Sequence, residues 1–332
     1  MQKKISVLIP VYNEAGNIHT IHKAIHDFFL EMPQYSHEQI FIDDGSSDLS
    51  LLQIRKLCTE YKNVAYISFS RNFGKDNALI AGFSNSMGDA VITIDADMQH
   101  PPSLMKQLLL EWESGYEMVY CYREKKNEHS GFKSQFFSSM FYKVINALSD
   151  IKMQEGVSDF RIMDRKVVDA INSMQEDHPF VRGMVHWVGF AQKGIPYIAE
   201  GRHTGDSSYK MKSLVKLALN GITSFSTKPL NIAIYLGFFF SMVSMLFIPY
   251  AIVSKIYGVA ISGWASVIVT IAFFGGLNLM ILGILGIYLG KSFMQGKKRP
   301  HYIISETNVD RMYEIDHSRK ELFENRSWTN IN

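Results

Sequence analysis

Two long stretches without a charged residue dominate the last third of the sequence. One runs from Pro229 to Ser254 and the other from Ile256 to Gly290, with Lys255 between them. Each is longer than the roughly 20 residues that a helix needs to cross the hydrocarbon core of a bilayer. Soluble core helices rarely extend this far without a charge, so the sequence predicts a hairpin of two transmembrane helices, at about 230–254 and 264–289.

Basic residues flank this predicted hairpin on both outer sides. They are Lys210, Lys212, Lys216 and Lys228 before it, and Lys291, Lys297, Lys298 and Arg299 after it. The positive-inside rule then places both chain ends in the cytoplasm of a multi-pass protein of the inner (plasma) membrane. The apolar run Ile5–Val11 is at the short limit for the apolar region of a signal peptide and is interrupted by Ser6 and Pro10, so we expect no signal peptide. We therefore expect a cytoplasmic domain over 1–226, the spans within 229–290, and a cytoplasmic tail over 291–332.

The first 125 residues alternate short β-rich runs with helical stretches. Strands are expected at 5–9, 39–43, 65–69, 90–95 and 118–122, and helices at 17–30, 48–61, 75–87 and 103–114. This alternation predicts an α/β fold with a mostly parallel sheet and helices on both faces. Ligands of such sheets bind beyond the carboxyl ends of the strands, which is where the polar clusters of this sequence lie.

Charge and motif content exclude several classes of protein. The chain has 34 basic and 32 acidic residues, a net charge of +2, which argues against general nucleic-acid binding. Its two cysteines are too few for a disulfide scaffold. Neither G-x-G-x-x-G nor a P-loop is present, which argues against a hydride-transfer enzyme or a P-loop ATPase.

Asp95 and Asp97 flank Ala96 directly after a predicted strand. Two carboxylates placed this way supply the hard oxygen ligands that Mg²⁺ or Mn²⁺ binds, and such a metal usually also binds substrate phosphates. It would neutralise the charge of a departing diphosphate. An ordinary acidic turn can have the same sequence pattern. The motif is specific here because a predicted strand precedes it and the segment 98–102 follows it.

Several motifs together resemble a known family. PVYNE at 10–14, DDGSSD at 43–48, SRNFGK at 70–75 and DADMQHPP at 95–102 resemble the family 2 glycosyltransferases, which have the GT-A fold. SDFRIMDR at 158–165, FVRG at 180–183, WVGF at 187–190, GITSFS at 221–226 and KKRP at 297–300 resemble the bacterial polyprenyl-phosphate glycosyltransferases. Within them the bactoprenol (undecaprenyl-phosphate) glucosyltransferase group is most similar, and dolichyl-phosphate mannose synthase is related. The resemblance implies inverting transfer of a sugar, expected to be glucose, from a UDP-sugar to undecaprenyl phosphate.

The resemblance also implies roles for individual residues. Those expected to bind the nucleotide sugar are Pro10, Tyr12, Asn13, Glu14, Asp44, Arg71, Lys75, Asp95 and Ala96. The metal ligands would be Asp95, Asp97 and Gln99, and the acceptor phosphate would meet Arg123, Lys133, Arg202 and Tyr209. The expected catalytic residues are Asp97, Asp159, Arg123 and Arg202. Asp159 could act as a base, orient another group, or pair with Arg161, and the last two roles are favoured.

Two positions depart from the family pattern, and two segments point to the bilayer. Ser158 stands where a glycine is usual, and Ser208 stands where a lysine usually precedes the tyrosine. The segments 132–148 and 209–225 interleave basic and apolar residues, which is typical of helices at a membrane surface, although core packing gives the same pattern.

Other functions remain open at this point. The same chemistry could use another sugar, such as N-acetylglucosamine. A processive polysaccharide synthase would carry a Q-x-x-R-W motif and more spans, and this chain has neither. A non-catalytic membrane scaffold would be expected to lose its metal ligands and phosphate-binding cations first. Small residues in the spans are also compatible with a homo-oligomer.

Overall fold

The computed structural model describes residues 2–123, 156–174, 176, 179–197, 226–257 and 263–310. The chain divides into two compact units. One consists of Met1–Gln135, Met153–Ser208 and Pro300–Asn332, and the other of Phe136–Lys152 and Tyr209–Arg299. The first unit contains the sheet, and the second contains the two long apolar helices.

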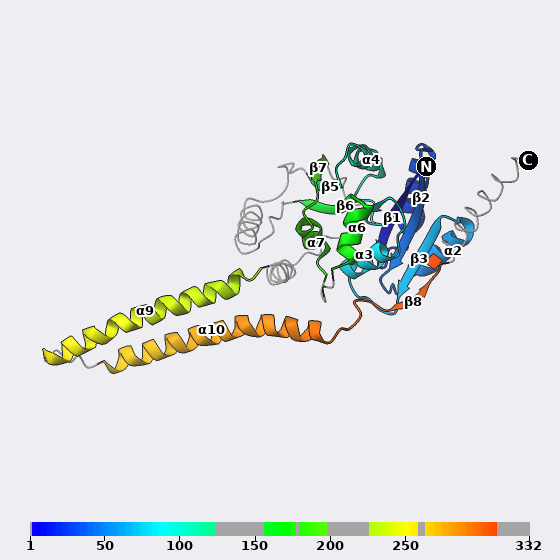
Figure 1. Ribbon diagram of the computed structural model, residues 1–332. Coiled ribbons are helices and arrows are strands. Elements are labelled where there is room, and N and C mark those ends of the chain that lie inside the picture. Colours follow the sequence, from blue (N-terminus) through cyan, green and yellow to red (C-terminus); the bar gives the residue numbers. More distant parts are fainter. Residues whose placement is uncertain are drawn as a thin grey trace, which may run out of the picture. The chain divides into compact units, whose positions relative to one another are not determined.

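Eight strands among the described residues form one sheet in the order β7-β5-β6-β4-β1-β2-β3-β8 (Figure 1). They are β1 (Lys3–Val11), β2 (Tyr35–Asp43), β3 (Val64–Phe69), β4 (Ala90–Thr93), β5 (Met118–Arg123), β6 (Val157–Asp164), β7 (Gln192–Tyr197) and β8 (Ile304–Thr307). Only β6 and β8 of this set run against their neighbours, so the sheet is mostly parallel, as predicted. Because β6 is reversed, it starts at the edge where β4 and β5 end.

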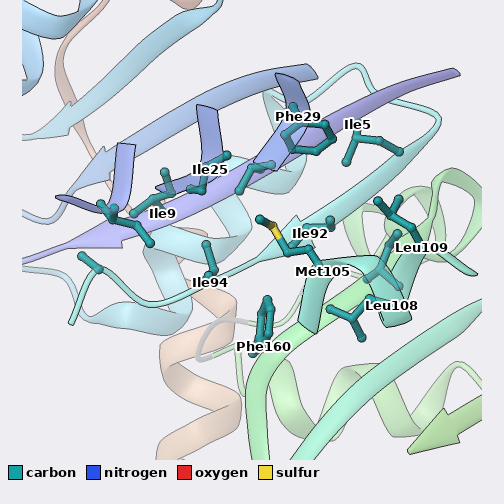
Figure 2. Close-up of a cluster of buried hydrophobic side chains, with 14 of the residues drawn as sticks. Ile5, Ile9, Ile25, Phe29, Ile92, Ile94, Met105, Leu108, Leu109 and Phe160 are labelled. Carbon is teal, nitrogen blue, oxygen red and sulfur yellow. The ribbon is translucent and has the colours of Figure 1, made fainter. Parts of the chain in front are cut away.

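Helices cover both faces of the sheet, and those expected in the first half of the chain are confirmed. They are α1 (Ile18–Leu30), α2 (Ser50–Glu60), α3 (Lys75–Ser84) and α4 (Met105–Glu113), followed by α6 (Arg165–Asn172) and α7 (Val181–Trp187). Successive side chains of a strand point to opposite faces. Ile5 and Ile9 of β1 therefore share one core with Ile25 of α1 and Leu108 of α4 (Figure 2). On the other face, a Cβ on Gly82 would lie 2.8 Å from Leu8, so this glycine allows α3 to pack closely.

The second unit contains α9 (Lys228–Ile256) and α10 (Trp264–Gly296). The two helices contact each other, and the ring of Phe240 lies 5.5 Å from the rings of Phe273 and Phe274. Within the described residues, Phe273–Gly296 is long and apolar enough to cross a membrane, whereas the apolar stretch Lys228–Val243 is shorter. The structure thus has helices over both uncharged runs, and the membrane-spanning hairpin stays a prediction.

The chain returns to the sheet after α10. β8 pairs with the outer edge of β3, and Arg55 of α2 forms an ion pair with Glu306 of β8. Val309, just beyond the strand, is buried. The sequence predicted only a tail here, because four residues with a mixed pattern give no strand signal of their own.

Candidate active site

The topology brings several loops to one edge of the sheet. Because β1 to β5 and β7 run in one direction, the segments that follow β1, β2, β3 and β4 lie at the same edge. Asp44 follows β2, and Asp95 and Asp97 follow β4. Arg123 ends β5, and Asp159 lies near the start of the reversed β6. The predicted site residues that the structure describes are therefore gathered at this edge.

Hydrogen bonds from both sides join the loop after β1 to the loop after β2. The Asn13 side-chain oxygen accepts a hydrogen bond of 2.8 Å from the Ser47 backbone N–H. The Glu14 carboxylate accepts one of 2.6 Å from the Asn17 side chain, and burial raises the pKa of Glu14. Tyr12 in the same loop is 49% exposed. Asn13 and Glu14 thus shape the loops, while the Tyr12 ring is accessible to a ligand.

Asp44 holds the loop that follows β3. Its carboxylate accepts hydrogen bonds from the backbone N–H groups of Phe73, at 2.6 Å, and Gly74, at 2.9 Å. Burial raises the pKa of Asp44 above the usual value of a carboxyl group, although these two hydrogen bonds oppose the shift. Gly45 has a φ of +70°, and a Cβ there would meet the Arg71 backbone at 2.4 Å. The guanidinium of Arg71 lies 3.9 Å from the centre of the Phe73 ring. The two loops are therefore in direct contact.

Asp95, Asp97 and His100 form a cluster suited to a metal ion. Each offers one ligand atom, and these atoms lie within 4.8 Å of one another. His100 is 6% exposed, and its Nδ1 has no hydrogen-bond partner among the described residues. Burial lowers the pKa of His100, which favours the neutral imidazole that can ligate a metal. The residues present thus fit a divalent cation.

Sequence reasoning assigned the third ligand to Gln99 and missed His100. The Gln99 backbone N–H donates to the Asp97 carboxylate at 3.1 Å, so this residue helps to fix Asp97. The available signal for His100 was its place three residues after Asp97 in the same motif. Its burial, which gives that position its meaning, is visible only in the fold.

Asp159 lies beside the metal-ligand cluster, among three cations. Lys75 Nζ is 2.8 Å from Asp159 and 2.5 Å from Asp95, so it bridges the two acids. Arg182 donates twice to Asp159, at 2.7 and 3.0 Å, and Arg161 donates once, at 3.2 Å. Burial alone would raise the pKa of Asp159, but the three cations outweigh it and hold that pKa well below the usual range. Such a carboxylate is a poor base, which agrees with the orienting and pairing roles.

Arg182 is a second residue that sequence reasoning left without a role. It lies on α7, and the backbone N–H of its neighbour Val181 donates to the Asp76 carboxylate of α3 at 3.1 Å. Burial, followed by repulsion from Asp159, raises the pKa of Asp76. Arg182 belongs to the FVRG motif, and the fold shows that this motif supplies the two hydrogen bonds to Asp159.

The acceptor-phosphate residues are described only in part. Arg123 is exposed at the end of β5, where its backbone N–H donates to Gly156 at 2.9 Å. Lys133, Arg202 and Tyr209 lie outside the described residues, as do the two predicted amphipathic segments, 132–148 and 209–225. A phosphate site built from these residues therefore stays a prediction.

Sequence comparison identifies the family to which the chain belongs. The model described as Glycosyl transferase family 2 matches residues 6–171, from β1 into α6, which includes Asp44, the Asp95–His100 cluster and Asp159. The chain belongs to glycosyl transferase family 2. It is thus a glycosyltransferase, as the motifs indicated, and the α/β sheet described above is its GT-A-like catalytic fold.

This glycosyltransferase has relatives that match nearly its whole length. It is 38% identical over 302 residues to the prophage bactoprenol glucosyl transferase homolog of Escherichia coli K12, covering 91% of this chain and 98% of that protein. It is 38% identical over 306 residues to the bactoprenol glucosyl transferase of Shigella phage SfII, covering 92% and 98%. The resemblance to the bactoprenol glucosyltransferase group is therefore confirmed.

A solved structure shows a weaker likeness to the glycosyltransferase. Glucosyl-3-phosphoglycerate synthase from Mycobacterium tuberculosis, crystallised with Mn²⁺, UDP and glucosyl-3-phosphoglycerate, is 18% identical, with a TM-score of 0.45. The match covers 67% of this chain and 78% of that one. A likeness of this degree carries no conclusion about the ligands of the present enzyme.

Proposed function

We propose that this glycosyltransferase moves glucose from UDP-glucose to undecaprenyl phosphate at the cytoplasmic face of the membrane. The observation that carries the proposal is the similarity, over more than nine-tenths of the chain, to two proteins named for glucosyl transfer to bactoprenol. The product would be a polyprenyl-phosphate-linked sugar that supplies cell-surface glycan modification. The bond between the anomeric carbon and UDP breaks, a phosphate oxygen of the lipid forms the new bond, and the configuration inverts.

The loops after β1, β2 and β3 are the proposed donor site. Tyr12 offers an accessible ring, and Arg71 offers an exposed cation near Asp44. An aromatic ring can stack on a base, and a guanidinium suits a phosphate. Pro10, Asn13 and Glu14 belong to the same loop and would shape the pocket around the nucleotide.

Asp95, Asp97 and His100 would hold a divalent cation, Mg²⁺ or Mn²⁺, with Gln99 beside them. When bound, that ion supplies charge neutralisation at the leaving diphosphate. The Nζ atom of Lys75 lies 2.5 Å from the Asp95 carboxylate, so it would compete with the metal ion for this ligand. We propose that Lys75 turns from Asp95 towards the donor phosphates, while Asp159 continues to hold it near the site.

The proposed reaction needs alignment and charge compensation more than a base. The acceptor phosphate is already anionic near neutral pH, so a strong general base is unnecessary. Two anionic substrates repel each other, so cations must surround them. Arg123, with Lys133, Arg202 and Tyr209, would hold the acceptor phosphate. Asp159 would keep Lys75 and Arg182 in position instead of removing a proton.

The membrane placement is a separate part of the proposal. Phe273–Gly296 is long and apolar enough to span a bilayer, and the other uncharged run would form the second span of a hairpin. The basic residues on both sides would keep the catalytic unit and both chain ends in the cytoplasm. The segments 132–148 and 209–225 would lie at the lipid surface, where a polyprenyl phosphate is accessible.

Sugar transfer by the purified full-length protein in detergent tests this function. The assay contains undecaprenyl phosphate, a panel of radiolabelled UDP-sugars and Mg²⁺ or Mn²⁺. We expect label in the lipid fraction with UDP-glucose, its loss in Asp97→Ala, and its retention in Asp27→Ala, which removes an exposed carboxylate of α1. Label from another donor, such as UDP-N-acetylglucosamine, would correct the sugar. Absence of lipid label with every donor, despite nucleotide binding, would overturn the lipid acceptor in favour of another acceptor or a binding role.

A further inference from the structure

The edge strand β8 is attached to β3 at the end that leads into the donor loops. Its register pairs Ser68 with Glu306 and Phe69 with Ile304, with an irregularity between them. One residue further along, the Ser70 backbone N–H donates to the Ile303 carbonyl at 3.0 Å. The pairing thus continues from the strand into the loop 70–74, which carries Arg71.

A row of aromatic rings links the same segment to Arg71. The rings of Tyr302 and Phe69 are stacked, with centroids 5.0 Å apart and planes 14° apart. Phe69 makes an edge-to-face contact with Phe73, with centroids 5.7 Å apart. The guanidinium of Arg71 lies over that second ring, 3.9 Å from its centre. Tyr302 thus packs on Phe69, Phe69 on Phe73, and Phe73 on the guanidinium of Arg71, which belongs to the proposed donor site.

The β2 loop holds the loop 70–74 from the side opposite β8. The Asp44 carboxylate accepts the backbone N–H groups of Phe73 and Gly74. The β2 loop also fits against the backbone of Arg71, where Gly45 leaves no room for a Cβ. The loop 70–74 therefore lies between the β2 loop and the residues that follow α10.

We infer that residues 302–309 are a structural part of the donor-nucleotide site, and that Tyr302 is a positioning residue for Arg71. This inference rests on the proposed function for the nature of the donor, a nucleoside diphosphate sugar. It extends the site beyond the span of the family match, which ends at residue 171. Tyr302 would act through Phe69 and Phe73, without contact to the substrate.

Residues 307–309 anchor β8 through contacts that do not involve Tyr302. A change at Tyr302 can therefore be distinguished from loss of the strand. Val309 is buried, the Thr307 hydroxyl donates to the Tyr66 carbonyl at 2.8 Å, and the Asn308 side chain accepts from the Tyr66 N–H at 2.7 Å. Removing the Tyr302 ring leaves all of these contacts in place. A substitution there should therefore alter the donor loop more than the stability of the sheet.

Nucleotide binding by the full-length protein in detergent tests the inference. Wild type, Tyr302→Ala, Tyr302→Phe and Leu30→Ala are titrated calorimetrically with UDP and with GDP, and whichever nucleotide binds wild type is used. Leu30→Ala is the control, because its side chain is 67% exposed at the end of α1, outside the proposed donor site. We expect Tyr302→Ala to weaken binding about tenfold, with Tyr302→Phe and Leu30→Ala within about twofold of wild type.

Kinetics and thermal unfolding provide the second readout. Tyr302→Ala should raise the KM for the donor and leave the KM for the lipid acceptor and the unfolding temperature close to wild type. Unchanged nucleotide affinity in Tyr302→Ala, or an equal weakening in Tyr302→Phe, would overturn the positioning role. Nucleotide binding without any labelled lipid would instead overturn the proposed reaction while the test of Tyr302 still stands. A wild type that binds neither nucleotide would overturn both.

Discussion

The two ends of the central strands both bury polar side chains, but they neutralise them differently. At the carboxyl end, Asp95 and Asp159 share the cation of Lys75, and His100 keeps a buried nitrogen without a partner among the described residues. At the amino end, the Ser6 hydroxyl donates to Glu38 at 2.6 Å, and His37 stacks on Phe29 with centroids 4.3 Å apart.

This difference distinguishes the candidate active site, at the carboxyl end, from the amino end, where the buried polar groups only stabilise the fold. At the amino end, the buried acid Glu38 lies 2.7 Å from the Lys4 ammonium group, and burial lowers the pKa of His22 and of His37, which favours their neutral form. At the carboxyl end, Lys75 lies beside Asp95, whereas Asp97 forms no ion pair within the part of the chain that the structure describes, so this acid pair retains the capacity to bind a further cation. Buried polar groups therefore do not mark function by themselves, whereas an acid cluster that shares its cations does.

Asp97→Asn should have the largest effect on activity. The change removes a charged ligand of the proposed metal with little change of shape, so kcat/KM should fall by about 10²–10³-fold. The unfolding temperature should stay close to wild type, because Asp97 has a single described hydrogen bond, to the Gln99 N–H. Lipid labelling and thermal unfolding measure the two quantities, with Asp27→Asn as control. Retention of more than a tenth of the activity would contradict the assignment.

Asp159→Asn should have the largest effect on stability. It removes the counter-charge of Arg161 and Arg182 and leaves Lys75 with Asp95 alone, and breaking a buried ion pair in this way costs about 3–5 kcal/mol. Denaturant unfolding of Asp159→Asn and Asp97→Asn side by side measures the contrast. If the two variants lose the same free energy of unfolding, the ion pairs of Asp159 do not distinguish its contribution to stability from that of Asp97.

Lys75→Met should separate metal binding from turnover. Without the ammonium group 2.5 Å from Asp95, Mn²⁺ no longer competes with an internal cation, so its affinity without nucleotide should rise about tenfold. Turnover should fall, because the donor phosphates lose a positive charge. Titration of Mn²⁺ followed by electron paramagnetic resonance measures the affinity, and Lys23→Met on the exposed face of α1 is the control. Weaker Mn²⁺ binding would show that Lys75 supports the metal instead.

His37 should make the amino end sensitive to acid without affecting the site. Burial, with help from His26 and His22, lowers the pKa of His37 to about 4, and its Nε2 accepts a hydrogen bond of 2.9 Å from Asn63. The folded state favours the neutral ring, so this stabilisation is complete above the unfolded pKa of about 6.5 and decreases as pH falls towards 4. About 2 kcal/mol should be lost between pH 7.5 and pH 5.

Thermal unfolding at several pH values measures this effect. His37→Gln should flatten the pH dependence below 6.5 and leave nucleotide affinity at pH 7.5 unchanged. An identical pH dependence in wild type and variant would assign the acid sensitivity to other groups.

The sequence predicts the regular part of the fold because periodicity and strand-end polarity are local signals. β1 to β5, α1 to α4 and the placement of Asp95 and Asp97 follow from such signals. Three features depend on pairing between distant segments, and they were missed. The contact of Arg182 with Asp159 requires α7 to pack near α3, the place of His100 beside Asp95 and Asp97 requires its burial, and β8 requires a partner more than 230 residues earlier in the chain.

The edge strand also has a consequence for how the protein is made. β3 is complete early in synthesis, but β8 leaves the ribosome only after both apolar helices have been translated. Until then the edge of β3 is open, and an unpaired strand edge is a template for wrong partners. A nascent chain that stalls in the second apolar helix would therefore expose this edge, so synthesis of the two apolar helices must precede completion of the catalytic sheet.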